Sequence, residues 1–274
     1  MRAIIGYNLI RMHPNKTCPK SEKRGSVGIA RKKKVCMTKL EIIQLGTKMF
    51  IEEGYTKTSA VSISRQLGIS TGNLTFHFPT KEHLLLELVK YLASFHEKCI
   101  NGLLERGYDE LHAYCWEVAA QIALCEDHET ARDLYLSAYS HPLTLEYIKQ
   151  WIAEKNDGLL AVRIPNWSEF RLRKVEHMVA GIEYAALLIP RNGEIDLREK
   201  ISLTLESLLK LYEVPREVRE QVIADCLEVD YHAIGIEILK NFTDYIERLN
   251  QEAIENLNRE AMEKHTRLNN IKGE

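Results

Sequence analysis

From residue 38 onward, apolar side chains recur at intervals of three and four along nearly the whole chain, which is the spacing of amphipathic helices. Seven prolines and fourteen glycines rarely interrupt this pattern, and no stretch alternates apolar and polar residues as a strand would. The pattern therefore predicts an all-α protein. We expect helices over residues 38–53, 59–67, 71–78, 81–104, 108–126, 129–140, 142–160, 168–189, 196–213, 215–227 and 229–268.

The residues between the first helices are typical helix ends. Gly54 and Gly68 suit the left-handed conformation in which many helices end. Thr58 and Ser70 offer hydroxyls that can cap the helices that follow them, and Pro79 stops the third helix. Two short helices joined by a glycine-containing turn thus follow a longer one. This predicts a helix-turn-helix whose third helix is free to enter a major groove.

The third helix has one face for the protein and one for a ligand. Leu74 and Phe78 lie one turn apart and face the core, so the remaining side chains point away. Asn can pair with adenine, and Thr can hydrogen-bond a base or touch a thymine methyl group. Backbone N–H groups at the starts of the helices suit phosphate oxygens, and Lys81 adds a point charge. The candidate DNA contacts are Thr58, Ser59, Ser70, Thr71, Gly72, Asn73, Thr75, Phe76, His77 and Lys81. For His77 the alternative is an ordinary solvated helix position.

Charge is distributed unevenly along the chain. The formal net charge is -2, but residues 1–90 carry 16 Lys and Arg against six Asp and Glu, while residues 91–274 carry 21 against 33. Residues 1–36 hold ten of the basic residues and one Glu, which predicts a disordered basic leader that strengthens DNA binding. The leader residues expected to contact DNA are Arg31, Lys32, Lys33 and Lys34. The alternative is that translation begins at Met37 and the leader is never made.

Four motifs follow one another at fixed spacing within residues 38–90. They are Phe50-Ile-Glu-Glu-Gly-Tyr-Thr-Lys-Thr-Ser59, Ile63, Gly68-Ile-Ser-Thr-Gly-Asn-Leu-Thr-Phe-His-Phe78 and Lys81-Glu-His-Leu-Leu85. In order and spacing they resemble the tetracycline-repressor (TetR) family. One position departs from the family, because Thr75 stands where members usually have an aromatic residue that meets the DNA backbone. Thr75 can still bond a phosphate, or Phe76 or His77 can take over that contact.

The resemblance implies a homodimeric transcriptional regulator with an N-terminal DNA reader and a variable helical domain that binds a small molecule and dimerises. We expect a repressor that leaves its palindromic operator when the effector binds, and we expect no cofactor. The expected domains are the leader over residues 1–36, a helix-turn-helix domain over residues 37–84, and an effector-binding and dimerisation domain over residues 85–274.

Aromatic residues concentrate in the second domain. Ten of the 21, including all three Trp, fall between residues 108 and 184. They can line a cavity for a largely apolar or aromatic effector, with two histidines that hydrogen-bond its polar groups. The alternative is that these aromatic residues simply fill the core. The candidate ligand contacts are His112, Tyr114, Trp116, Tyr135, Tyr139, His141, Tyr147 and Trp151.

Two late helices carry long apolar stripes. On the face beside one stripe, the small residues Gly181 and Ala185 would let another helix approach closely. The pair can meet its two-fold copy as a four-helix bundle, or both stripes can be internal core. The candidate dimer contacts are Leu172, Val175, Val179, Ile182, Ala186, Ile189, Ile201, Leu205, Leu208 and Tyr212.

Catalytic and metal motifs are absent from the sequence, which has no P-loop, no G-x-S-x-G and no H-E-x-x-H. The six cysteines form no C-x-x-C pair, and the first residues lack a signal-peptide pattern. We therefore expect a cytoplasmic protein that is not an enzyme and holds no metal. Two other classes stay open: a protein-interaction module on the same fold to which DNA binding is incidental, and a helical-bundle enzyme.

Overall fold

The computed structural model describes residues 26–160, 167–189 and 195–272. These residues form eleven helices and no strand, which confirms the all-α prediction. Apart from the start of α1 and the end of α11, each helix begins and ends within two residues of its predicted bounds. The helices are α1 (Ser26–Glu52), α2 (Ala60–Leu67), α3 (Thr71–His77), α4 (Lys81–Glu105), α5 (Glu110–Asp127), α6 (Glu129–Ser140), α7 (Pro142–Leu160), α8 (Glu169–Leu188), α9 (Leu197–Leu211), α10 (Arg216–Leu227) and α11 (Tyr231–Lys272). Within the described ranges, none of them has the length and apolarity needed to cross a membrane.

The first four helices pack around a small core of their own. Ile42 and Phe50 of α1 and Ile63 of α2 are completely buried in it. Helices α1 and α4 approach closely at Gly46, where a Cβ atom would lie 2.4 Å from Cδ2 of Leu84. Because the interior is close-packed, a side chain at this position would push α4 away from the helix-turn-helix.

The hydroxyl that caps α2 belongs to Ser59, so the prediction of a Thr58 cap is wrong. Ser59 Oγ accepts from the Ser62 N–H, and Ser62 Oγ accepts from the Ser59 N–H, each at 3.0 Å. Thr58 is buried instead, and its hydroxyl donates to the Gly54 carbonyl at 2.8 Å. Thr58 thereby closes the turn after α1, in which Gly54 has a φ of +96°.

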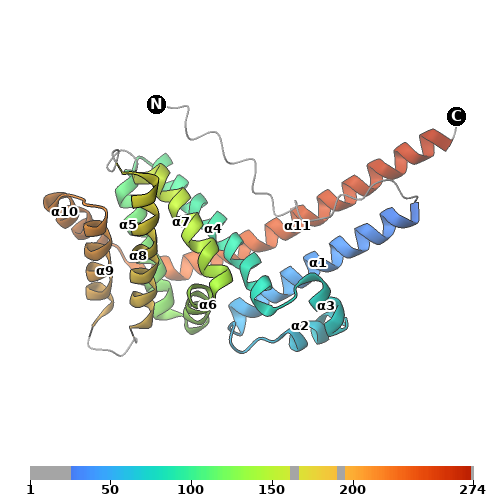
Figure 1. Cartoon of the computed structure of the whole chain (residues 1–274), viewed down its shortest axis with the longest axis horizontal. Coiled ribbons are helices and arrows are strands. Elements are labelled where there is room, and N and C mark those ends of the chain that lie inside the picture. Colours follow the sequence, from blue (N-terminus) through green and yellow to red (C-terminus); the bar gives the residue numbers. More distant parts are fainter. Residues whose placement is uncertain (1–25, 161–166, 190–194, 273–274) are drawn as a thin grey trace.

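Helix α1 begins at Ser26, so the prediction of a disordered leader is wrong for residues 26–36. The basic run over residues 31–34 is part of this helix. Helix α11 runs alongside α1 in the opposite chain direction (Figure 1). Tertiary packing on a neighbour stabilises helices whose own apolar pattern is weak, which the sequence pattern alone does not reveal. Residues 1–25 lie outside the described residues.

Helix α5 lies at the centre of the second body. Most of its residues are buried, because α4, α6, α7, α8, α9, α10 and α11 all contact it. Helix α11 packs along α5 and continues past α4 to α1 (Figure 1). A buried hydrogen bond of 3.2 Å from the Tyr91 hydroxyl to Oδ1 of Asn250 joins α4 to α11. The last helix thus connects the centre of the second body to the first helix of the chain.

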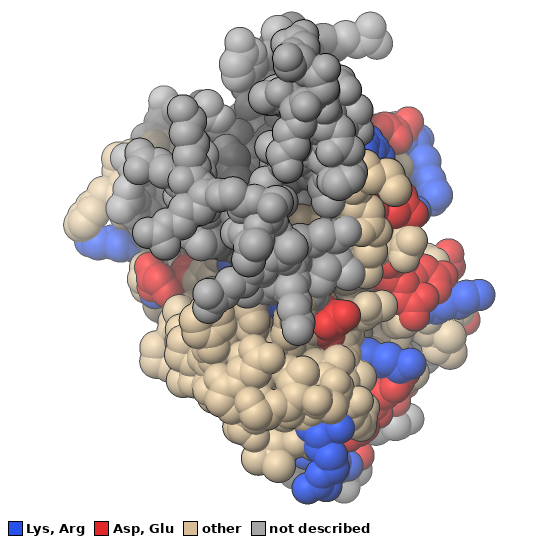
Figure 2. Space-filling model, turned by 90° about the vertical axis from the view of Figure 1, so that its right-hand side faces the viewer, with Lys and Arg blue, Asp and Glu red and all other residues tan. Residues whose placement is uncertain are grey.

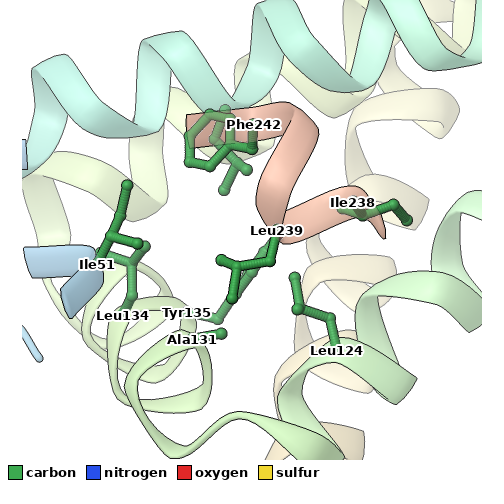
Figure 3. Close-up of a pocket in the computed structure, with 9 residues that line it drawn as sticks. Ile51, Leu124, Ala131, Leu134, Tyr135, Ile238, Leu239 and Phe242 are labelled. Atoms are coloured by element: carbon green, nitrogen blue, oxygen red, sulfur yellow. The ribbon is translucent and has the colours of Figure 1, made fainter. Parts of the chain in front are cut away.

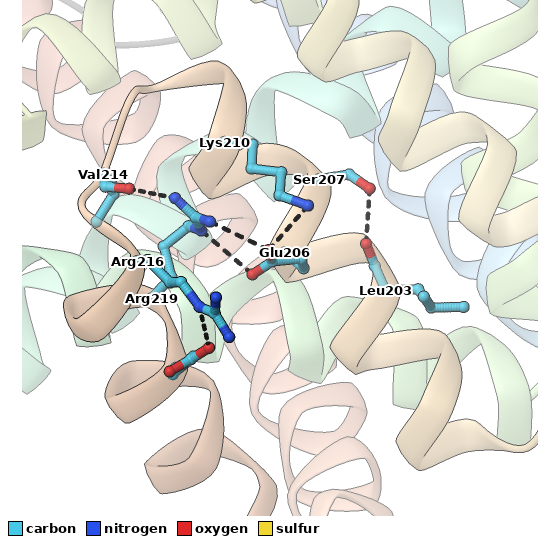
Figure 4. A network of polar contacts seen from close by, with 8 residues as sticks. Leu203, Glu206, Ser207, Lys210, Val214, Arg216 and Arg219 are labelled. Carbon is cyan, nitrogen blue, oxygen red and sulfur yellow. Dashed lines mark hydrogen bonds and ion pairs between the residues drawn. The ribbon is translucent and has the colours of Figure 1, made fainter.

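A polar network fixes α10 against α9 (Figure 4). Arg219 donates through Nη1 to the Val214 carbonyl at 2.6 Å, and its Nε and Nη2 each lie 3.3 Å from the Glu206 carboxylate. Lys210 Nζ lies 3.0 Å from the same carboxylate. Although partial burial acts in the opposite direction, the hydrogen bonds from Lys210 and Arg219 lower the pKa of Glu206. The network leaves another side of α9 open to solvent, where Leu203 is 52% exposed.

Candidate nucleic-acid interface and ligand pocket

Helix α3 is anchored at its start and along one side. Ser70 Oγ accepts from the Asn73 N–H at 3.1 Å, which is the cap that the sequence predicts. Leu74 and Phe78 are each 2% exposed, so they hold α3 on the body as predicted. The opposite side of the helix is left to the solvent.

The outward face of α3 is exposed and carries no ionic side chain. Its residues are Thr71, Gly72, Asn73, Thr75 and Phe76. The largest of them, Phe76, is 73% exposed. Figure 2 looks onto this end of the molecule, and it shows a broad uncharged surface in its lower half with Lys and Arg side chains at the lower edge. Such a face suits base edges, whereas contacts to phosphates have to come from neighbouring elements.

His77 lies at the border of the outward face and is partly buried. Its ring meets the Phe76 ring edge-on, with 5.1 Å between the ring centroids. Burial, together with the nearby Lys39 ammonium, lowers the pKa of His77. The imidazole is therefore neutral at pH 7, and a DNA contact through it would be a hydrogen bond without charge.

The Lys81 ammonium points into the protein, and not toward an approaching phosphate as predicted. Its Nζ donates to the carbonyls of Tyr55 and Thr58 at 3.0 and 3.1 Å, and it lies 3.8 Å from the centroid of the Tyr55 ring. Burial lowers the pKa of Lys81, although the carboxylates of Glu82 and Asp133 act against this. Lys81 therefore holds the turn before α2 in place.

Asp133 of α6 connects the second body to the same turn. One of its oxygens accepts from the Thr56 N–H at 2.7 Å, and the other accepts from the Thr56 hydroxyl. Gly54 leaves room for this contact, because a Cβ atom there would lie 3.0 Å from Oδ2 of Asp133. Sequence reasoning missed the contact, since it joins residues 77 positions apart and only Gly54 hinted at a close approach.

A pocket lies between α4, α5, α6 and α7. It brings together four of the predicted ligand contacts, Tyr135, Tyr139, Tyr147 and Trp151. The other lining residues are Val89, Leu92, Ala93, His96, Gln121, Ala138 and Ile148. Sequence reasoning missed His96, although it lies four residues after Leu92 and seven after Val89 on one helix stripe. The free space holds no more than a water-sized molecule, so a larger ligand enters only by moving these side chains.

Two hydrogen-bonded groups give this pocket its polar character. His96 Nδ1 lies 2.7 Å from the Glu117 carboxylate, and Nε2 lies 3.1 Å from the Tyr135 hydroxyl. The Tyr139 hydroxyl donates to Glu183 of α8 at 2.6 Å. Burial and the Glu183 carboxylate raise the pKa of Tyr139. The pocket is thus apolar and aromatic, with a few polar groups that can orient a ligand.

The other four predicted ligand contacts lie outside this pocket, so the prediction does not hold for them there. They are His112, Tyr114, Trp116 and His141. His112 lies between Asp109 and Asp225, with nitrogen–oxygen distances of 2.7 and 3.2 Å, and so bridges α5 to α10. Tyr114 is fully buried against Tyr212, with 5.9 Å between the ring centroids. These positions serve packing between helices, which is the alternative that the sequence left open.

A second, apolar pocket lies where α1, α4, α5, α6 and α11 meet (Figure 3). Ile51 reaches it from α1, Leu134 from α6 and Phe242 from α11. Leu92 and Tyr135 line both pockets. Tyr135 thus faces the free space of both pockets.

Residues 42–88 comprise α2, α3 and the adjoining parts of α1 and α4, and they match the family described as "Bacterial regulatory proteins, tetR family". The helix-turn-helix segment of this chain is similar to that of the TetR family. This confirms the resemblance found in the sequence motifs. The match covers the helix-turn-helix and not the helices that follow α4.

Two curated relatives are similar to part of this chain. The uncharacterized HTH-type transcriptional regulator YuxN of Bacillus subtilis (strain 168) is 29% identical over 108 residues, which are 38% of this chain and 36% of the relative. The HTH-type transcriptional regulator HbdR of Aromatoleum sp. (strain CIB) is 34% identical over 88 residues, which are 30% of this chain and 38% of the relative. The matched segment thus spans little more than a third of each relative's length.

Solved structures of TetR proteins are similar at lower identity. The Thermus thermophilus repressor FadR, in complex with lauroyl-CoA, is 21% identical with a TM-score of 0.47 over 62% of this chain and 93% of its own. CprB from S. coelicolor A3(2) is 19% identical with a TM-score of 0.41 over 72% of this chain and 100% of its own.

The apolar stripes predicted to form the dimer interface face the interior of the protomer. Six of the ten residues are at most 4% exposed: Val179, Ala186, Ile201, Leu205, Leu208 and Tyr212. The prediction is wrong for these six, because the strongest apolar period of a helix marks its core side. Val175, Ile182 and Ile189 are partly buried, and the side chain of Leu172 lies outside the described residues.

A different face of α8 and α9 carries exposed apolar side chains, with the exposed Lys174 and His177 among them. On α8, Phe170, Met178 and Leu188 are 69%, 59% and 49% exposed, and Leu203 extends the face onto α9. Gly181 lies between them on the same side of the helix, and no atom lies within 4 Å of a Cβ added there. In the sequence, this face was indicated by the small residues Gly181 and Ala185 and not by the stripe of large apolar residues.

Proposed function

We propose that this chain is a homodimeric, sequence-specific DNA-binding transcriptional regulator, a repressor that releases its operator when a small apolar or aromatic molecule binds. The observation that carries the proposal is the exposed, uncharged face of α3 within the helix-turn-helix. Residues 37–84 would form the DNA-binding domain and residues 85–274 the effector-binding and dimerisation domain.

Dimerisation would use the exposed apolar face of α8 and α9. Large side chains such as Met178 and Leu203 stand in solvent there, beside a glycine that lets a second backbone approach closely. Two copies related by a two-fold axis would form a four-helix contact. The two α3 helices would then enter successive major grooves about 34–36 Å apart on a palindromic operator.

Effector binding would reach the DNA-binding domain through α6. This helix carries Tyr135 and Tyr139, which line the pocket, and Asp133, which holds the backbone and hydroxyl of Thr56. Since the pocket has room only for a water-sized molecule, an effector has to displace α6 or α7 as it enters. A shift of Asp133 would move the turn before α2, and with it the spacing of the two reading helices.

Selection from randomised DNA duplexes with the full-length chain tests sequence-specific binding. We expect an enriched palindrome that binds two protomers, measured by fluorescence anisotropy and native mass. Asn73→Ala should keep the fold and relax the choice of operator, because its side chain is exposed and contacts a base. An enriched pool without a palindrome would reject the proposal and favour a protein-interaction module on the same fold.

Effector release is tested by filling the pocket. Ala138 is 2% exposed and lines the pocket, so Ala138→Trp should occupy its free space. Apolar and aromatic compounds are screened for release of labelled operator from the wild type. We expect the active compounds to leave the Ala138→Trp complex intact, while its operator affinity without compound serves as the control for folding. If every active compound released the variant equally, the effector site would lie elsewhere.

A further inference from the structure

We propose that α3 reads A·T base pairs, with the Phe76 ring against a thymine methyl group and the Asn73 amide hydrogen-bonded to an adenine. The inference rests on the proposed function, because it names the class of DNA sequence that the same helix recognises. The observation behind it is the chemistry of the outward face of α3, taken together with the positions of the nearest basic side chains.

The outward face of α3 lacks the groups that read G·C pairs. Guanine is most often read by Arg or Lys at O6 and N7, and cytosine by the carboxylates of Asp or Glu at N4. The sequence of α3, Thr-Gly-Asn-Leu-Thr-Phe-His, contains none of these four residue types. Thr hydroxyls can bond either base pair, so the discriminating pairings that remain are Asn at adenine N6 and N7 and apolar groups at the thymine methyl.

Three described basic side chains of neighbouring elements are engaged or placed elsewhere. Lys81 donates to the carbonyls of Tyr55 and Thr58. Lys39 lies over the Phe78 ring, 5.5 Å from its centroid. The first helix of a helix-turn-helix crosses the DNA backbone, so the exposed Arg65 of α2 is placed for a phosphate and not for a base.

The shape of α3 favours contact between Phe76 and a groove. Phe76 is 73% exposed, and Gly72 lies one turn earlier on the same ridge. The nearest atom to a Cβ added at Gly72 is Ser70 Oγ at 3.9 Å. No side chain therefore stands on this ridge of α3, one turn before the Phe76 ring. Asn73 lies three positions before Phe76 and therefore beside it on the helix surface. The helix can thus bring both side chains to adjacent bases.

Thr75 adds a second apolar group to this face. Its hydroxyl donates to the Gly72 carbonyl at 3.2 Å, which engages its proton within the helix. The methyl group is the part of Thr75 left to a ligand, and methyl groups pack on thymine C5. The face therefore carries one amide for adenine and two apolar groups for thymine.

The experiment removes single methyl groups from the operator. The full-length chain first selects its palindrome from randomised duplexes, and each thymine of the half-site is then replaced by deoxyuridine, which lacks only the C5 methyl. We expect one position per half-site at which this replacement weakens the wild type about fourfold, the effect of exposing one methyl group. Phe76→Ala should bind more weakly and show no further loss at that position.

Val61→Ala is the matched control, because Val61 is an exposed apolar residue of α2 in the same domain. It should retain the full deoxyuridine penalty. Likewise, 7-deazaadenine should weaken the wild type at one position and leave Asn73→Ala unchanged. Thermal unfolding checks that the variants fold. We expect them to fold, because the substituted side chains are exposed.

The outcomes separate this inference from the proposed function. A selected palindrome with G·C pairs at the positions sensitive to Phe76 and Asn73 would overturn the inference and keep the regulator. Equal deoxyuridine penalties in the wild type and Phe76→Ala would do the same. A pool with no enriched palindrome would overturn both.

Discussion

The turn over residues 54–58 is fixed by two charged side chains from outside it. Lys81 holds it from α4 by binding two carbonyls, and Asp133 holds it from α6 by binding Thr56. Neither contact could be predicted from sequence spacing, because the pairs are distant in the chain. The local features did follow from the sequence, since Gly54 has the left-handed φ expected of it and Ser70 caps α3.

Lys81→Met should separate positioning from phosphate binding. The change keeps the aliphatic stem and removes the donors, so we expect the free energy of unfolding to fall by about 1 kcal/mol. The slope of log K against log salt should stay unchanged, because a phosphate contact alone would contribute about 0.9 to it. Lys57→Met, at an exposed position of the same turn, is the control. A flatter slope with unchanged stability for Lys81→Met would show that its charge faces the DNA.

His112 should make stability depend on pH. Burial acts against protonation, but hydrogen bonds to Asp109 and Asp225 raise the pKa of His112 above its ordinary value of about 6.5. A raised folded-state pKa gives stability that is fully present below the unfolded pKa and is lost as pH rises through the folded one.

We therefore expect the stability difference between the wild type and His112→Gln to shrink as pH rises above about 6.5, measured by urea unfolding at each pH. The comparison with the variant matters, because the lowered pKa of His77 contributes the opposite slope in both proteins. A difference that grew with pH would show that His112 is bound as the neutral imidazole.

At the scale of elements, sequence periodicity located nearly every helix but not the partner of each face. The stripe through Val179 and Leu205 has the period expected of a contact surface, yet periodicity does not tell a protomer's own core from a second copy. The start of α1 was missed because its stability comes from α11, which is distant in sequence. Four of the eight predicted ligand contacts line one pocket, because aromatic residues at helix spacing fill whichever space the bundle leaves.

Gly181→Arg should disrupt the dimer without unfolding the protomer. No atom lies within 4 Å of a Cβ added at Gly181, so the protomer accommodates the side chain, whereas a packed partner helix does not. We expect a monomer by sedimentation, an unchanged helical signal and a loss of operator affinity. Gly102→Arg is the matched control, because Gly102 is also helical and has nothing within 4 Å of an added Cβ. A Gly181→Arg protein that sedimented as the wild type would place the interface elsewhere.

At the scale of the whole molecule, positive charge is concentrated near the start of the sequence, ahead of the helix-turn-helix. Residues 31–34 are part of α1, while the surface around the helix-turn-helix in Figure 2 is largely uncharged. Composition indicated DNA correctly, yet the charges and the reading face belong to different helices. Substitutions in α3 and in residues 31–34 should therefore change sequence recognition and overall attraction to DNA separately.

Replacing Arg31, Lys32, Lys33 and Lys34 by Gln should lower affinity for all duplexes alike and flatten the slope of log K against log salt, because fewer counterions are released. The preference for the operator over random DNA should persist. Arg216→Gln on α10 serves as the control, since Arg216 is exposed and paired with Glu220. An unchanged slope in a fluorescence titration would show that these four residues do not approach DNA.

The packing of α11 on α1 sets an order of events during synthesis. The ribosome makes α1 and the helix-turn-helix first, whereas α11 emerges only after α2 to α10. Until then, the side of α1 that α11 covers is left without its neighbour, and contacts between segments so distant in sequence form slowly. A nascent chain therefore has all the residues of α1, α2 and α3 before α11 can pack on α1.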